Sequence, residues 1–202
     1  MSRVLVLFAH PNQTESKVNL GLFRLAHAID GVTAVDLYAE YPRFKVDIDT
    51  EQDRLLEHDL IVLQFPFYWY STPALLKEWQ DLVLEFGFAY GEKGDKLKGK
   101  SLLVATTAGG AEEAYQEEGK NHFPIRTLLA PLEQTAGLCQ MHYLAPLVLF
   151  ASLTATDDDR AERHREAWQM LLHAAVDDRL DIERAEDADL MDVAALPIHE
   201  PA

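Results

Sequence analysis

Cysteine and basic side chains are scarce in this sequence of 202 residues. The single cysteine, Cys139, excludes an intramolecular disulfide and indicates a reducing compartment. Its neighbours are apolar, which favours a buried thiol over a reactive nucleophile. Only 18 lysines and arginines stand against 34 aspartates and glutamates, giving a formal net charge of −16. Because such a surface repels a phosphate backbone, nucleic acid is not an expected partner, and solubility is the simplest explanation of the charge.

Long apolar runs and metal-binding patterns are also missing. The apolar run at residues 4–8 is too short for the core of a signal peptide, and no run reaches the roughly 20 residues that cross a bilayer. We therefore expect a cytoplasmic protein. The tripeptide Ala9-His10-Pro11 also opens a class of zinc-dependent deacetylases, but there it continues with Asp-Asp-Glu. Here no carboxylate precedes Glu15 and no histidine pair with ligand spacing follows, so no metal is expected.

The sequence does contain a regular alternation of short apolar runs and amphipathic segments. Strands are predicted at residues 3–9, 32–37, 60–65, 101–106 and within 140–150, and helices at 16–30, 50–58, 73–86, 125–136 and 157–176. This order predicts an α/β fold, a flavodoxin-like doubly wound sheet of five parallel strands with helices on both faces. Residues 1–176 would form this domain. Residues 177–202 contain nine acids and two arginines, which predicts an acidic C-terminal tail, partly disordered unless it docks.

A polar loop follows the first predicted strand and leads into the first predicted helix. The N-terminus of a helix offers free N–H groups and a positive dipole end, which favour an anion such as a phosphate. A second explanation stays open, namely a proline-induced turn in which Ser16 merely caps the helix. The candidate phosphate ligands in this loop are His10, Thr14, Ser16, Lys17, Val18 and Asn19.

A second loop, after the predicted strand at 60–65, is rich in aromatic side chains. Since the carboxyl ends of parallel strands meet at one edge of a sheet, both loops predict one site for a phosphorylated aromatic cofactor. An aromatic dimer interface is the other explanation, and the two are compatible because a second subunit can close over such a ligand. The candidates here are Pro66, Phe67, Tyr68, Trp69 and Tyr70.

A third loop, after the predicted strand at 101–106, combines hydroxyls with glycine. Glycine lets the backbone approach a planar ring, and N–H groups there can stabilise negative charge on a flavin. The candidates are Thr106, Thr107, Ala108, Gly109 and Gly110.

Tyr115 and His122 follow on the next stretch of chain. Such a pair can donate a hydrogen bond or a proton to a quinone oxygen, which makes both candidate catalytic residues. It is an equally good explanation that both are ordinary surface residues of a loop, without a catalytic role.

Several motifs occur together in one order along the first 150 residues. They include Ala9-His10-Pro11 and Tyr70-Ser71-Thr72-Pro73, within segments 9–19, 36–42, 70–79, 106–107 and 136–142. In these segments the chain resembles the NAD(P)H:quinone oxidoreductase branch of the flavodoxin-like superfamily. Within that branch it is most similar to KefF and KefG, the ancillary subunits of glutathione-gated potassium efflux systems.

The resemblance implies a homodimer with one FMN or FAD per subunit. His10 and residues 16–19 would hold the flavin phosphate, residues 67–70 would contact the ring, and residues 106–109 its pyrimidine edge. It also implies two-electron ping-pong chemistry, in which NADPH or NADH passes hydride to flavin N5 and leaves before a quinone or similar electrophile binds.

The same resemblance supports a second function. The protein would be a regulatory subunit of a potassium efflux antiporter, reaching the inner face of the membrane only through that partner. A third hypothesis, an electron-transfer flavodoxin, is weaker because a simple carrier needs no closed substrate pocket.

Overall fold

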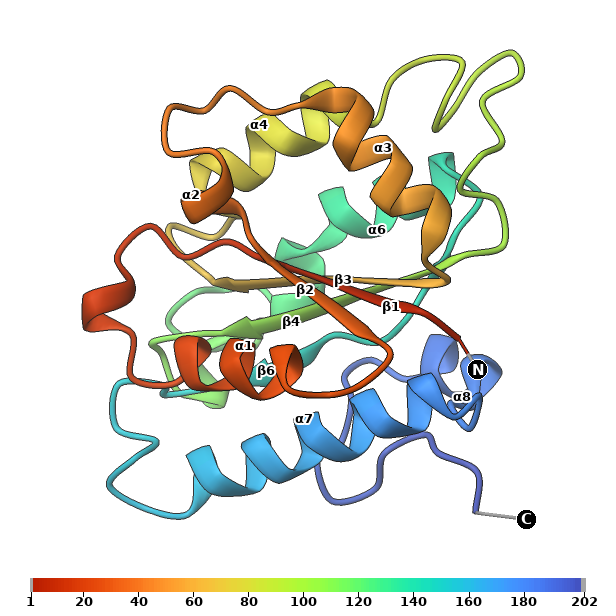
Figure 1. Cartoon of the computed structure of the whole chain (residues 1–202). Coiled ribbons are helices and arrows are strands. Elements are labelled where there is room, and N and C mark those ends of the chain that lie inside the picture. The colour runs from red at the N-terminus through yellow and green to blue at the C-terminus, as the bar shows by residue number, and fades with distance from the viewer. Residues whose placement is uncertain (1, 201–202) are drawn as a thin grey trace.

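The central sheet is built from strands that all run in the same direction. A computed structural model describes residues 2–200 (Figure 1). The sheet order is β2-β1-β3-β4-β5, and every pairing is parallel. The strands are β1 Val4–Phe8, β2 Val32–Asp36, β3 Leu60–Pro66, β4 Ser101–Thr107, β5 His142–Tyr143 and β6 Leu147–Leu149. The predicted doubly wound parallel sheet is confirmed.

The fifth position of the sheet is shared by β5 and β6. β5 pairs with Ser101 and Leu102 at the start of β4, and β6 pairs with residues 105–107 at its end. Between them lies Pro146, which has no N–H to donate to a sheet ladder. The single strand predicted within 140–150 is therefore interrupted.

Helices cover both faces of the sheet (Figure 1). α1 Asn19–His27 and α7 Arg160–Val176 pack on one face. The other face carries α2 Leu37–Glu40, α3 Ile48–Glu57, α4 Ala74–Val83, α5 Ile125–Leu128 and α6 Ala130–Leu138. Short 3₁₀ turns lie at Gln13–Glu15 and Glu112–Ala114.

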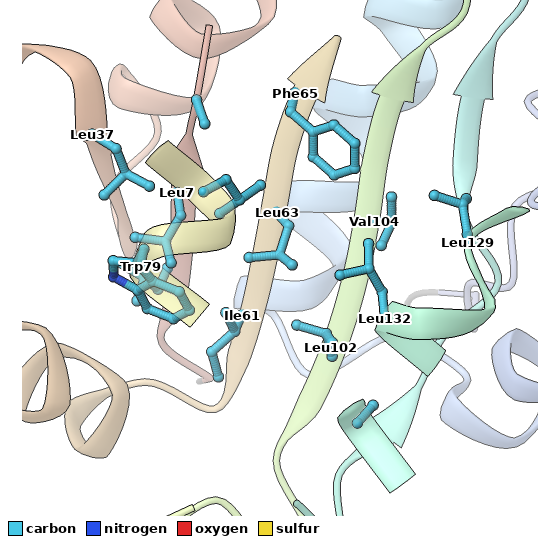
Figure 2. Packing of buried hydrophobic residues seen from close by; sticks show 14 of the residues in the cluster. Leu7, Leu37, Ile61, Leu63, Phe65, Trp79, Leu102, Val104, Leu129 and Leu132 are labelled. Atoms are coloured by element: carbon cyan, nitrogen blue, oxygen red, sulfur yellow. The ribbon is translucent and has the colours of Figure 1, made fainter. Parts of the chain in front are cut away.

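Two hydrophobic cores follow from the alternation of side chains along each strand. Leu7 and Leu63 point to the face where Trp79 of α4 packs, as Figure 2 shows. Val6 and Val62 point to the opposite face, where Trp168 of α7 is completely buried. β1, β3 and β4 are buried along their whole length and are therefore largely apolar, which made them easy to predict.

Several helix boundaries differ from the prediction because local hydrogen bonds decide them. The 3₁₀ turn delays α1 to Asn19, although the Ser16 hydroxyl still accepts a hydrogen bond from the N–H of Leu20 (3.0 Å). α3 begins at Ile48, before the predicted start at residue 50, because the Asp47 side chain caps it. α4 extends only from Ala74 to Val83. The helix predicted at 125–136 is divided into α5 and α6 at Leu129.

The segment after residue 176 packs against the face of the sheet that α7 covers, and residues 197–199 pair back with residues 179–181. It forms α8 Ile182–Asp187, and it buries Ala185 and Met191 in the core beneath α7. The N–H of Ala145 donates to the carbonyl of Ala185, and the N–H of Met191 donates to the carbonyl of Pro146. These contacts cover the outer edge of the sheet at the β5 end. Residues 201 and 202 of the predicted tail lie outside the described residues.

No helix within residues 2–200 is long and apolar enough to span a membrane.

Candidate functional site

A cavity of about 330 Å³ opens at the carboxyl ends of β1, β3 and β4. This is the sheet edge where α/β proteins bind ligands, and the volume lies in the range of small-molecule sites, about 300–1,000 Å³. All three predicted loops contribute to it. The predicted residues that line the cavity are His10, Ser16, Lys17, Val18, Asn19, Pro66, Phe67, Tyr68, Trp69, Thr107 and Gly109.

The predicted residues that do not line the cavity are Thr14, Tyr70, Thr106, Ala108 and Gly110. Strand alternation explains Thr106, because Thr107 faces α1, where Asn19 donates to it, and its neighbour Thr106 faces the other side of the sheet. Ala108, directly after β4, packs in the core of that other side, and Gly110 lies against the ring of Tyr115. The Thr106 hydroxyl accordingly donates to the carbonyl of Phe65 (2.7 Å), and Ala108 is fully buried. Thr14 is exposed and bonds Asn12 instead.

The cavity also contains three residues that were not predicted, Glu15, Ser152 and Leu153. Ser152 and Leu153 come from a fourth loop, directly after β6, where Lys17 Nζ donates to the carbonyl of Leu153 (3.0 Å). Because β6 ends at the same sheet edge as β1 and β3, an accurate end for the fifth strand would have placed this loop at the site.

His10 is a buried and neutral imidazole in the wall of the cavity. Its Nδ1 accepts a hydrogen bond from the backbone N–H of Asn12 (3.2 Å), so the ring proton is on Nε2. Burial lowers the pKa of His10 below its usual range, and the negative charge of Asp36 opposes this shift only in part. His10 is therefore a neutral hydrogen-bond donor, through Nε2, at neutral pH.

Asn19, the first residue of α1, connects the polar side of the cavity to β4. Its Nδ2 donates to the hydroxyl of Thr107 (2.7 Å), and both residues are buried. Its Oδ1 is buried without a hydrogen-bond partner among the described residues. An unsatisfied acceptor in a cavity wall is a position that a bound hydroxyl or N–H group would satisfy.

The aromatic side of the cavity is a tight and strained turn. Trp69 and Tyr70 both have left-handed backbones, with φ of 48° and 63°, and the N–H of Ser71 donates to the carbonyl of Tyr68 (3.1 Å). Two consecutive residues with positive φ define a type I′ turn, which ordinarily contains asparagine and glycine. The turn leaves the side chain of Trp69 92% exposed. Backbone strain of this kind is concentrated at functional sites.

Tyr115 and His122 lie outside the cavity wall. Tyr115 is buried, with its ring between those of Phe67 (6.3 Å) and Phe150 (5.6 Å). Burial raises the pKa of Tyr115, and the nearby Tyr70 raises it further, so the phenol keeps its proton. His122 is exposed and no hydrogen bond joins it to Tyr115 within the described part of the chain. Their catalytic role stays a prediction.

The geometry fits a ligand with an anionic end and a planar aromatic body. Donors gather around the first turn of α1, where Ser16, Lys17 and His10 meet the positive end of the helix dipole. Phe67, Tyr68 and Trp69 line the same cavity, with the ring of Tyr68 6.1 Å from that of His10. A side-chain carbon added at Gly109 would meet only Leu153 Cδ1, at 3.9 Å, so the backbone there is open to close approach. No group of three or more potential metal ligands occurs within residues 2–200.

Known proteins share this architecture. KefG of Pectobacterium carotovorum, a glutathione-regulated potassium-efflux system ancillary protein, is 47% identical over 73% of this chain and 81% of its own. General stress protein 14 of Treponema denticola, solved in complex with FMN, is 35% identical over 86% of this chain and 99% of its own, with a TM-score of 0.80. An NADPH-quinone reductase structure from P. pentosaceus is 31% identical over 84% of this chain and 97% of its own, with a TM-score of 0.74.

The family model for the flavodoxin-like fold matches residues 2–172, so that among residues 2–200 the end of α7 and the C-terminal segment after it lie outside the match. The chain belongs to the family of proteins with a flavodoxin-like fold.

Proposed function

We propose that this protein is an FMN-dependent NAD(P)H oxidoreductase whose acceptor is a quinone or a similar two-electron electrophile. One observation carries the proposal: the cavity joins anion-binding groups at the N-terminus of α1 to an aromatic wall at the end of β3. The FMN-bound relative and the quinone reductase neighbour support it.

The residues of the cavity fit the two ends of FMN. Ser16, Lys17 and the Nε2–H of His10 would hold the phosphate, and the buried Asn19 Oδ1 would gain a donor from the ribityl chain. Phe67 and Trp69 would contact the ring. When bound, FMN supplies two-electron chemistry between a nicotinamide and an acceptor. The protein's part is to bind, orient and shield the reacting groups.

Tyr115 has the protonation state that an acid requires, because its raised pKa keeps the phenol neutral. Its ring packs against that of Phe67, which lines the cavity, so Tyr115 lies one side chain away from the proposed site. His122 would join it only if its loop moved, since the side chain is exposed and outside the cavity.

A homodimer is part of the proposal. Exposed apolar side chains surround the mouth of the cavity, with Trp69 92% exposed, Leu153 66% and Tyr70 49%. A second subunit placed there would bury these side chains and complete the site. Sedimentation velocity of the FMN-loaded protein is expected to give a dimer, and a Trp69→Asp variant is expected to be monomeric.

A regulatory role beside a potassium efflux antiporter is the second candidate, and it rests on the identity to KefG. The protein would then be cytoplasmic and would reach the membrane only through that antiporter. Potassium efflux by the antiporter, measured with and without this protein, decides whether the role exists.

Enzyme activity is tested by the oxidation of NADPH and of NADH with a water-soluble quinone. Turnover that requires FMN and follows parallel lines in double-reciprocal plots supports a ping-pong oxidoreductase. An FMN-loaded protein that oxidises neither nucleotide contradicts the proposed activity.

A further inference from the structure

Gln64 lies at the end of β3, beneath the polar loop of the cavity. It is 1% exposed, and alternation along the strand points its side chain to the α1 face, together with Val62. It does not line the cavity itself. The polar loop above it, residues 10–18, contains the groups that would hold a phosphate.

A single residue holds both ends of this loop. The backbone carbonyl of Gln64 accepts a hydrogen bond from the N–H of Ala9 (2.9 Å), directly before His10. The side-chain Nε2 of Gln64 donates to the backbone carbonyl of Asn19 (2.8 Å), directly after Val18. The two ends of the loop are therefore fixed to the same point on β3.

The chemistry of Gln64 argues against a purely structural role. Its Oε1 is buried without a partner among the described residues, so half of the amide is unsatisfied. A buried polar atom without a partner destabilises a fold, and an apolar side chain would pack there without that cost. Only the Nε2 group of the amide has a partner, because it donates a hydrogen bond to the carbonyl of Asn19 at the N-terminus of α1.

We propose that Gln64 is a positioning residue, whose side chain sets the phosphate-binding shape of residues 10–18 by fixing the Asn19 end of the loop to β3, while the β1–β3 backbone ladder fixes the Ala9 end. The inference rests on the proposed FMN site. The side chain of Asn19 adds a second link, from the same end of the loop to Thr107 on β4. Together they hold the donors of the polar loop at a set distance from the aromatic wall.

The test compares FMN with riboflavin, which has the same ring and ribityl chain but no phosphate. Dissociation constants for both are measured by flavin fluorescence on the full-length apoprotein, wild type and Gln64→Met. Methionine keeps the length of the side chain and removes the donor. We expect the preference for FMN over riboflavin to fall by about tenfold, which corresponds to one hydrogen bond lost from the loop.

Gln80→Met is the matched control, because Gln80 also donates its amide to a backbone carbonyl (Leu76, 3.0 Å), but within α4 and away from the cavity. It is expected to leave the preference unchanged. If Gln64→Met does not yield folded protein, Gln64→Leu also removes the donor with an apolar side chain and is expected to show the same selective loss.

The outcomes separate the two proposals. An unchanged preference in a folded Gln64 variant, or an equal loss for both flavins, overturns the positioning role and leaves the FMN site intact. A wild-type protein that binds FMN no better than riboflavin contradicts the phosphate site itself.

Discussion

His10 Nδ1 accepts a hydrogen bond from the backbone N–H of Asn12, at 3.2 Å, within the loop that follows β1. This contact determines which nitrogen of the ring can serve a ligand. Because Nδ1 is already used and burial keeps the imidazole neutral, only Nε2–H is available to donate.

Substitutions of His10 therefore distinguish the two nitrogens. His10→Gln places an amide N–H near the position of Nε2 and is expected to keep FMN affinity within a fewfold of wild type. His10→Leu removes the donor and is expected to weaken FMN binding by about tenfold to a hundredfold, as for hydrogen bonds to charged groups. Titration of the apoproteins with FMN measures the affinity of both variants. Equal losses of affinity in His10→Gln and His10→Leu would contradict the assignment of Nε2–H as the donor.

The strained turn gives one prediction for stability and a separate one for flavin binding. Trp69→Gly and Trp69→Ala both remove an exposed indole, but only glycine adopts the left-handed backbone of this residue without strain. We expect the glycine variant of the apoprotein to be more stable than the alanine variant by about 1 kcal/mol in urea unfolding. Both should retain FMN less well than wild type, and replacing Tyr70 by alanine as well should weaken retention and slow reduction further.

A glycine variant no more stable than the alanine variant would show that the turn is not strained. Normal flavin content and turnover in the double alanine variant would remove the aromatic turn from the site.

His164 on α7 predicts a pH dependence of stability. Burial lowers its pKa to about 4, against an ordinary value of 6.5, and its Nδ1 has no hydrogen-bond partner among the described residues. Above pH 6.5 both the folded and unfolded states hold a neutral ring, so pH has no effect through this group. As the pH falls from 6.5 to about 4, the unfolded state binds a proton that the folded state does not, and about 3 kcal/mol of stability is lost.

Unfolding of wild type and His164→Leu at a series of pH values isolates this contribution, since the carboxylates are common to both. The free energy of unfolding of the variant, relative to that of wild type, is expected to increase progressively as the pH falls below 6.5. A difference that stays constant between pH 7 and 4 would mean that His164 titrates normally in the folded protein.

The docked C-terminal segment predicts unequal effects of two methionine substitutions. Met191 is 6% exposed in the core beneath α7, whereas Met170 is 52% exposed. Met191→Ala should lower the free energy of unfolding by roughly 2 kcal/mol or more, and Met170→Ala by less than about 0.5 kcal/mol. Equal effects would show that the segment after residue 176 adds no stability through its docking.

The sheet and its order could be predicted because each central strand contains a run of at least four apolar residues and is followed by a loop of distinct composition. The loops could be assigned to one edge from the rule for parallel strands alone. The sequence did not determine which side chains face the cavity. A shift of one residue in the strand register decides whether Thr106 or Thr107 lines it, and in the structure it is Thr107.

Other features depend on contacts that no local pattern encodes. The turn at Trp69 and Tyr70 lacks the glycine or asparagine that marks a type I′ turn. The segment after residue 176 has an acidic composition, yet a few apolar residues, Ala185 and Met191 among them, suffice to dock it on a surface that only the folded sheet provides. The hydrogen bond from Gln64 to Asn19 also depends on tertiary structure, because it joins residues 45 positions apart in the sequence.

The most direct measurement is an absorbance spectrum of the full-length protein after incubation with FMN and removal of free flavin, followed by anaerobic addition of NADPH and, separately, NADH. We expect flavin bands that remain with the protein, match one FMN per chain and bleach with at least one nucleotide. A protein that stays colourless, or whose bound flavin neither nucleotide reduces, would contradict the assignment of this cavity as an FMN-dependent oxidoreductase site.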